Sequence, residues 1–180
     1  MKIYTKFGDS GGTALYGGTR LGKDALQFEA IGTVDELNAY VGYAQTLIDD
    51  SDLSDLMARV QNHLFAIGAD LATPATHSKA SEMRISGNFT TEMETAIDTL
   101  SAELPPLKNF ILPGGCPVGA ILHIARVVCR RSERCVVRLS REIDINMEIV
   151  RSLNRLSDLL FVLARTVNFR AKASEPIWKP

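Results

Sequence analysis

Apolar residues recur at helical spacing over nearly the whole stretch from residue 25 to residue 172. The clearest stripe lies in the last segment, about 146–172, where apolar side chains return every three or four residues. Its members are Ile149, Leu153, Leu156, Leu160, Leu163 and Val167. This spacing puts the side chains on one helix face, so the chain must bury the stripes of several helices against one another.

Four further segments repeat this periodicity and predict the other helices. They cover about 33–48, 53–71, 91–104 and 122–138, and the first can begin as early as Leu26. Residues 73–86 are polar and predict a loop. Five helices with short or moderate connections predict an all-α fold, an antiparallel five-helix bundle in a single domain.

Two helix starts are predicted from sequence signals at the N-terminal ends of these segments. Thr33 with Glu36, and Thr91 with Glu94, have the form of capping boxes, in which a threonine hydroxyl and a glutamate satisfy free N–H groups. The pair of prolines after Leu104 ends the third helix.

Composition and charge exclude several classes of protein. With 180 residues and 46% hydrophobic content, the chain can bury a sizeable core. A net charge of −1 argues against a general nucleic-acid or membrane-surface binder. No apolar run approaches the roughly 20 residues of a membrane span, and the first residues lack a signal-peptide core. The expected location is the cytoplasm, or an organelle reached by another route.

Cysteine and histidine do not suggest a metal site built by the protein. The three cysteines are odd in number and lack paired ligand spacing, so they are expected to be free thiols. The three histidines lie far apart in sequence. We expect them to be structural or exposed, and only His123 shares a helix face with a cluster of arginines.

That cluster lies on the segment from Leu122 to Arg138, which segregates its residues by chemistry. Its predicted apolar face is Ile121, Ile124, Ala125, Val128, Ser132, Cys135, Val136 and Leu139, and its predicted polar face is His123, Arg126, Arg130, Glu133 and Arg134. Arginine offers a planar donor fork suited to phosphate, so a polyanion is the natural ligand. A solvated face with weak ion pairs remains the alternative for this helix alone.

The N-terminal segment is a second candidate for anion binding. Five of the 13 glycines fall between Thr5 and Gly18, and such density lets backbone N–H groups converge on phosphate oxygens. The segment is not a Walker A loop, because the GxxxxGK[ST] pattern is absent. A flexible loop or hairpin without a ligand is an equally good interpretation of this segment by itself.

Six motifs in order resemble those of the PduO-type ATP:cob(I)alamin adenosyltransferases, and they cover nearly the whole chain. Besides the arginine helix they are Tyr4-Thr-Lys-x-Gly-Asp-x-Gly, Gly-Gly-x-Arg-x-x-Lys23, Glu29-Ala-x-Gly-Thr-x-Asp-Glu-Leu37, Phe110-Ile-Leu-Pro-Gly-Gly115 and Asn154-Arg-Leu-Ser-Asp-Leu159. The resemblance implies transfer of the 5′-deoxyadenosyl group of ATP to cob(I)alamin, with release of triphosphate. It divides the domain, residues 1–180, into an ATP-binding loop (1–24), a helical bundle (25–172) and a tail (173–180).

The resemblance also implies site residues. Those expected around ATP are Thr5, Lys6, Phe7, Gly8, Thr13, Ala14, Lys23, Arg130, Arg131, Glu133, Arg134 and Asn154. Asp35, Phe110, Arg126 and Arg130 are the expected catalytic group, with Asp35 paired to Arg126 across a subunit boundary and Phe110 against the corrin. Mg²⁺ would be bound through the ATP phosphates.

Expected partners follow from the same resemblance. They are a homotrimer with active sites between subunits, a flavoprotein reductase and a B12-dependent enzyme.

Three rival classes of function are a nucleotide-binding regulator, a structural helical oligomer, and a phosphotransferase or ATPase that uses the same anion site. The last differs by its product, because attack at phosphorus releases ADP or diphosphate instead of triphosphate.

Overall fold

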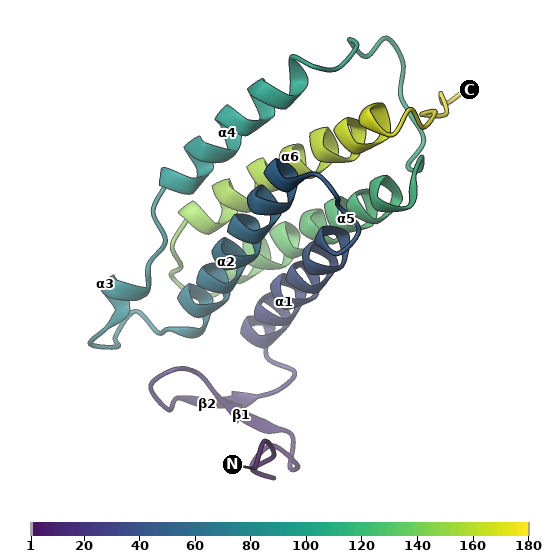
Figure 1. Ribbon diagram of the computed structural model, residues 1–180. Coiled ribbons are helices and arrows are strands. Elements are labelled where there is room, and N and C mark those ends of the chain that lie inside the picture. The colour runs from purple at the N-terminus through teal and green to yellow at the C-terminus, as the bar shows by residue number, and fades with distance from the viewer. Residues whose placement is uncertain (1, 180) are drawn as a thin grey trace.

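The computed structural model describes residues 2–179, and five long helices packed side by side dominate them (Figure 1). The predicted all-α bundle is therefore confirmed. Its long helices are α1 (Leu26–Gln45), α2 (Ser51–Ala72), α4 (Asn88–Ser101), α5 (Pro117–Leu139) and α6 (Glu148–Arg170).

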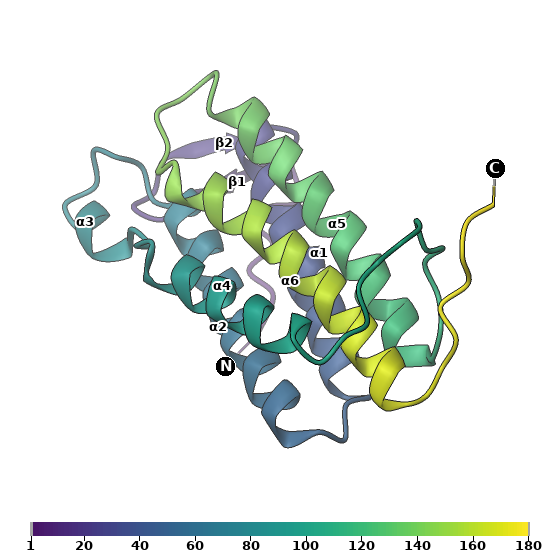
Figure 2. The ribbon, with the colours of Figure 1, turned by 90° about the horizontal axis from the view of Figure 1, so that it is seen from above.

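The helices pack in a fixed order around one core. α5 lies between α1 and α6, while α2 covers α1 and α4 covers α6 (Figure 2). The predicted stripes of α2 and α6 are buried throughout their length, because each faces two neighbouring helices. Among residues 2–179, no helix has the length and apolar character needed to cross a membrane.

Both predicted capping boxes are wrong. α1 begins at Leu26, so Thr33 lies inside the helix, where its hydroxyl donates to the carbonyl of Ala30 at 3.0 Å. α4 begins at Asn88, and Thr91 likewise bonds back to Gly87 rather than capping. Threonine satisfies its hydroxyl inside a helix in this way, so the pattern alone does not fix a start.

The segment predicted as a polar loop between α2 and α4 contains one short helix, α3 (Ala80–Met83). A buried carboxylate anchors this segment. Asp70 forms an ion pair with Arg84 and accepts from the backbone N–H of Ile85 and from Asn146, each at 2.9 Å. Since Asn146 lies between α5 and α6, Asp70 joins three parts of the chain at one end of the bundle.

The glycine-rich N-terminal segment forms a hairpin of β1 (Gly12–Ala14) and β2 (Arg20–Gly22), paired antiparallel with Thr13 opposite Leu21. Gly17 and Gly18 turn the chain with φ near +92° and +93°, a conformation that glycine adopts without strain. The hairpin lies at the end of the bundle where α1 begins (Figure 1).

Candidate functional site

Four of the residues expected around ATP share one cavity on the bundle surface. Arg130, Glu133 and Arg134 come from α5 and Asn154 from α6, and the cavity measures about 490 Å³. Asn154 donates to Glu133 Oε1 at 3.0 Å, so the two polar helix faces are linked inside it. The arginine head groups make no ion pair with Glu133 among the described residues.

Arg131 is not brought to this cavity, although it was expected to bind ATP. Its guanidinium forms an ion pair with Glu36 of α1. The reason is helical geometry, because adjacent residues point about 100° apart and Arg131 faces α1 while Arg130 faces the cavity.

The expected ATP residues of the N-terminal segment form a separate group. Lys6 has φ of +60°, and its carbonyl accepts from Asp9 N–H at 3.3 Å. The Lys23 side chain lies across Gly8, where an added Cβ would come within 2.9 Å of its Nζ. Because Gly8 has no side chain, the ammonium group of Lys23 can lie against the backbone. A positive charge in this position suits the binding of an anion.

Within one chain these two groups do not share a cavity. The 490 Å³ cavity is lined entirely by α5, α6 and Arg141 of the connection between them. Thr5, Lys6, Phe7, Gly8, Thr13, Ala14 and Lys23 all lie on the hairpin segment instead. Phe7 stacks under Arg20, whose guanidinium carbon is 4.4 Å from the ring centroid, so part of this segment packs on itself.

Asp35 and Arg126 are also apart within the chain. Asp35 lies beside an apolar cavity of about 470 Å³ between α1 and α2, next to Phe65, which is 75% exposed. Arg126 instead lies 6.0 Å from the ring centroid of Phe161. Burial, with the nearby charge of Arg130, lowers the pKa of Arg126, and its buried Nε has no hydrogen-bond partner among the described residues.

His123 is buried, which corrects its expected place on the exposed polar face. Its ring lies 6.1 Å from that of Phe161, and neither nitrogen has a hydrogen-bond partner in residues 2–179. Burial lowers its pKa, Arg126 lowers it further, and Glu175 opposes both. Ile124, in contrast, was expected on the apolar face but is 43% exposed, since no helix in residues 2–179 covers it.

Phe110 lies in the long connection between α4 and α5 and is 80% exposed. Its carbonyl accepts from Trp178 N–H at 2.8 Å, and the two rings meet edge to face with centroids 6.4 Å apart. This connection and the C-terminal tail lie at the opposite end of the bundle from the hairpin (Figures 1 and 2). The apolar side chain of Phe110 is therefore exposed to solvent and accessible to a ligand.

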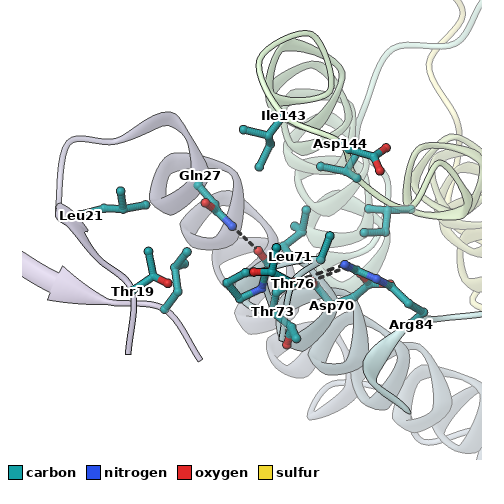
Figure 3. A pocket seen from close by; sticks show the side chains of 15 residues that line it. Thr19, Leu21, Gln27, Asp70, Leu71, Thr73, Thr76, Arg84, Ile143 and Asp144 are labelled. Atoms are coloured by element: carbon teal, nitrogen blue, oxygen red, sulfur yellow. Dashed lines mark hydrogen bonds and ion pairs between the residues drawn. The ribbon is translucent and has the colours of Figure 1, made fainter. Parts of the chain in front are cut away.

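A third cavity, about 320 Å³, lies between the hairpin, the end of α2 and the connection between α5 and α6 (Figure 3). None of the expected site residues lines it. Gln27 spans it to donate to the carbonyl of Leu71 at 2.7 Å, and Arg84 points to Asp70. Its main polar groups are thus occupied with one another, which indicates a structural role.

The chain matches the family model described as cobalamin adenosyltransferase over residues 3–167. It belongs to the cobalamin adenosyltransferase family. The match includes the hairpin, the first four long helices, α6 as far as Val167, and each residue of the 490 Å³ cavity.

Individual members of the family are similar over most of this chain. It is 44% identical to the corrinoid adenosyltransferase of Bacillus subtilis, over 95% of this chain and 89% of the relative. It is 39% identical to the PduO corrinoid adenosyltransferase of Citrobacter freundii over 99% of its length, and spans about half, 53%, of that relative.

Solved structures give the same assignment. A variant of the PduO-type ATP:corrinoid adenosyltransferase from Lactobacillus reuteri, complexed with cobalamin and ATP, superposes with a TM-score of 0.95. Identity is 39%, and the match covers 99% of this chain and all of that one.

Part of the 490 Å³ cavity was not predicted from the sequence. Val137, Arg138 and Arg141 complete its lining. Helical spacing could have found Arg138, which follows Arg134 by four residues and lies on the same face. Arg141 lies beyond the end of α5, where periodicity no longer applies.

Proposed function

We propose that this chain transfers the 5′-deoxyadenosyl group of ATP to cob(I)alamin, giving adenosylcobalamin and triphosphate. The observation that carries the proposal is the cavity in which Arg130, Arg134 and the Asn154–Glu133 pair converge, in a chain that belongs to the cobalamin adenosyltransferase family. Arginine forks suit phosphate oxygens, and an amide held by a carboxylate suits the neutral part of a nucleotide.

The chemistry requires charge and orientation more than an acid or a base. Co(I) supplies the electron pair of the new cobalt–carbon bond at C5′, and the broken C5′–O bond leaves its electron pair on triphosphate. Arg130 and Arg134 would stabilise the negative charge that develops on that leaving group. Alignment of C5′ with cobalt contributes up to roughly 7–11 kcal/mol in well-ordered cases. Mg²⁺ would enter with ATP, bound to its phosphates.

We propose a homotrimer in which the hairpin of one subunit closes a cavity of another. This is the 490 Å³ cavity lined by Arg130, Glu133, Arg134 and Asn154, called the arginine cavity below. This arrangement would join the two groups of expected ATP residues, which share no cavity within one chain. Asp35 and Arg126 form no ion pair in the described chain, so each is free to pair between subunits. Sedimentation equilibrium should give about three times the chain mass of 19.7 kDa. A monomer that is fully active would contradict this arrangement.

Phe110 is proposed to lie against the corrin and to exclude the lower axial base. Its 80% exposure leaves the ring free to cover a flat apolar ligand. Cobalt without a lower ligand is more easily reduced from Co(II), so this contact would matter most when reduction takes place on the enzyme. We place the reaction in the cytoplasm, with a flavoprotein reductase as electron donor and a B12-dependent enzyme as recipient of the product.

The test is an anaerobic incubation with MgATP and chemically reduced cobalamin. The visible spectrum should change to that of adenosylcobalamin, with one triphosphate released per cobalamin converted. ADP or diphosphate as the product would mean attack at phosphorus and would support the phosphotransferase alternative. Tight ATP binding without any product would support the nucleotide-binding regulator.

A further inference from the structure

The face of α6 that carries Asn154 in the arginine cavity continues towards the C-terminal end of the helix with Arg165 and Asn168. Here the polar side chains bind the long connection between α4 and α5. Arg165, 8% exposed, donates to the carbonyl of Pro105 at 2.9 Å. Arg170 makes a bidentate ion pair with Glu103, through Nη2 at 2.6 Å and Nε at 3.1 Å. The start of the connection that carries Phe110 is therefore tied to the end of α6.

Asn168 ties the other end of the same connection. Its amide nitrogen donates to the carbonyl of Gly114 at 3.0 Å, and its amide oxygen accepts from Cys116 N–H at 2.9 Å. The side chain is 1% exposed, and a Cβ at either Gly115 or Gly119 would overlap it. Asn168 thus holds the two peptide groups that flank Gly115, where φ is +103°.

The backbone of Asn168 also directs the C-terminal tail, which bonds to Phe110. Its carbonyl accepts from Ala173 N–H at 2.8 Å, which directs the C-terminal tail away from α6. The tail then pairs with the connection, since Leu112 N–H donates to Pro176 and Trp178 N–H to Phe110, both at 2.8 Å. Phe110 is consequently held between two attachments that both originate at Asn168.

We propose that Asn168 is a positioning residue for Phe110. The proposal rests on the role given to Phe110 above, and it concerns placement rather than contact with either substrate. Because the Phe110 ring is 80% exposed, the core does not fix its location, and the backbone attachments must do so. A side chain that excludes a ligand atom has to be placed closely, and a displacement of about 1 Å can cost roughly 100-fold in rate.

The experiment compares adenosylation from cob(II)alamin, reduced on the enzyme, with adenosylation from chemically reduced cob(I)alamin. Asn168→Ala should lower the first rate by roughly 10–100-fold. The second rate and the KM for ATP should stay within about twofold, because the arginine cavity and the chemistry at C5′ are untouched. The fraction of enzyme-bound cob(II)alamin without a lower ligand, measured by electron paramagnetic resonance, should fall in parallel.

Two further variants keep the test valid if Asn168→Ala folds poorly. Asn168→Asp retains the acceptor for Cys116 N–H and loses the donor to Gly114, so it should give an intermediate loss. Gly119→Ala displaces the Asn168 amide from the α5 side without removing it, and should change the same rate in the same direction. The matched control is Thr166→Val, whose buried hydroxyl bonds only to Val162 within α6; it should behave as wild type.

The double variant Asn168→Ala with Phe110→Ala decides whether the effect passes through Phe110. If it does, the double variant should match Phe110→Ala alone in the cob(II)alamin assay. Losses that multiply, or an equal loss from cob(I)alamin, would overturn the positioning role. If Phe110→Ala itself keeps the wild-type rate from cob(II)alamin, the role of Phe110 fails. If Phe110→Ala lowers that rate while Asn168→Ala and Gly119→Ala keep the wild-type rate, the positioning proposal fails and the role of Phe110 stands.

Discussion

Asn154 and Asn168 lie on one helix, about four turns apart, and have opposite surroundings. Asn154 is exposed in the arginine cavity, and its side chain donates to Glu133 on the neighbouring helix. Asn168 is buried, with both ends of its amide bound to backbone. The difference comes from what covers α6 at each position. At Asn154 nothing in the described chain covers the helix, whereas at Asn168 a long connection crosses it.

The largest effect that tests this comparison is on stability. Asn168→Ala leaves the carbonyl of Gly114 and the N–H of Cys116 without their buried partner, each at a cost of about 1–3 kcal/mol. We expect the free energy of unfolding to fall by about 2–5 kcal/mol. Asn154→Ala should change it by no more than about 0.5 kcal/mol. Urea unfolding followed by circular dichroism measures both.

Equal losses from the two alanine variants would break the comparison. They would mean that Asn154 is as deeply integrated in the folded chain as Asn168. Both variants are compared at one protein concentration, because the stability of an oligomer such as the proposed trimer depends on concentration.

The next effect concerns the arginine cavity around Asn154, where loss of a side chain should affect ATP use instead of folding. Arg130→Ala removes charge-assisted bonds worth about 1.5–3 kcal/mol each. Steady-state kinetics should show kcat/KM for ATP falling at least about tenfold. The control is Arg59→Ala, which removes an exposed ion pair with Glu92. If the two variants have the same kcat/KM for ATP, Arg130 does not bind the nucleotide.

The fold was largely predictable because the buried residues of a helix recur every three or four positions, and this period is visible in the sequence. The stripes of α2 and α6 were correctly identified, and each of their members is buried. Helix starts were predicted less well. α2 begins at Ser51 because the Asp50 carboxylate accepts from Asp52 and Leu53 N–H, a cap just before the predicted start at residue 53. The two threonine patterns predicted to cap helices lie inside them instead.

The site was predictable only where its residues share a helix face. Arg130, Glu133 and Arg134 were found from spacing, and Asn154 was paired with them through the family resemblance. His123 has the same spacing as a surface residue, but Phe161 and the C-terminal tail lie over it. Periodicity describes one helix at a time, so it does not report which distant segment will cover a polar face. The function of Asn168 as an attachment point was hidden for the same reason.

A third polar contact to α6 is expected to have the smallest effect. It extends the comparison between Asn154 and Asn168. His63 Nε2 lies 2.6 Å from Ser152 Oγ and its ring stacks on Phe89. Ser152 precedes Asn154 by two residues but is fully buried. If coverage rather than position along α6 decides the role, this contact should behave like that of Asn168 and contribute to stability.

The contribution of the His63 contact should make the free energy of unfolding depend on pH. Burial lowers the pKa of His63 from 6.5 to about 4, although the nearby charge of Glu92 opposes the shift. Between these values the unfolded chain binds more protons than the folded one, so stability falls as the pH drops from 6.5 towards 4. We expect a loss of about 2 kcal/mol after allowance for partial solvent screening. His63→Gln retains a hydrogen-bonding side chain without this titration and should lose that part of the slope. An unchanged difference in unfolding free energy between the two proteins across this pH range would show that His63 titrates as an ordinary exposed histidine.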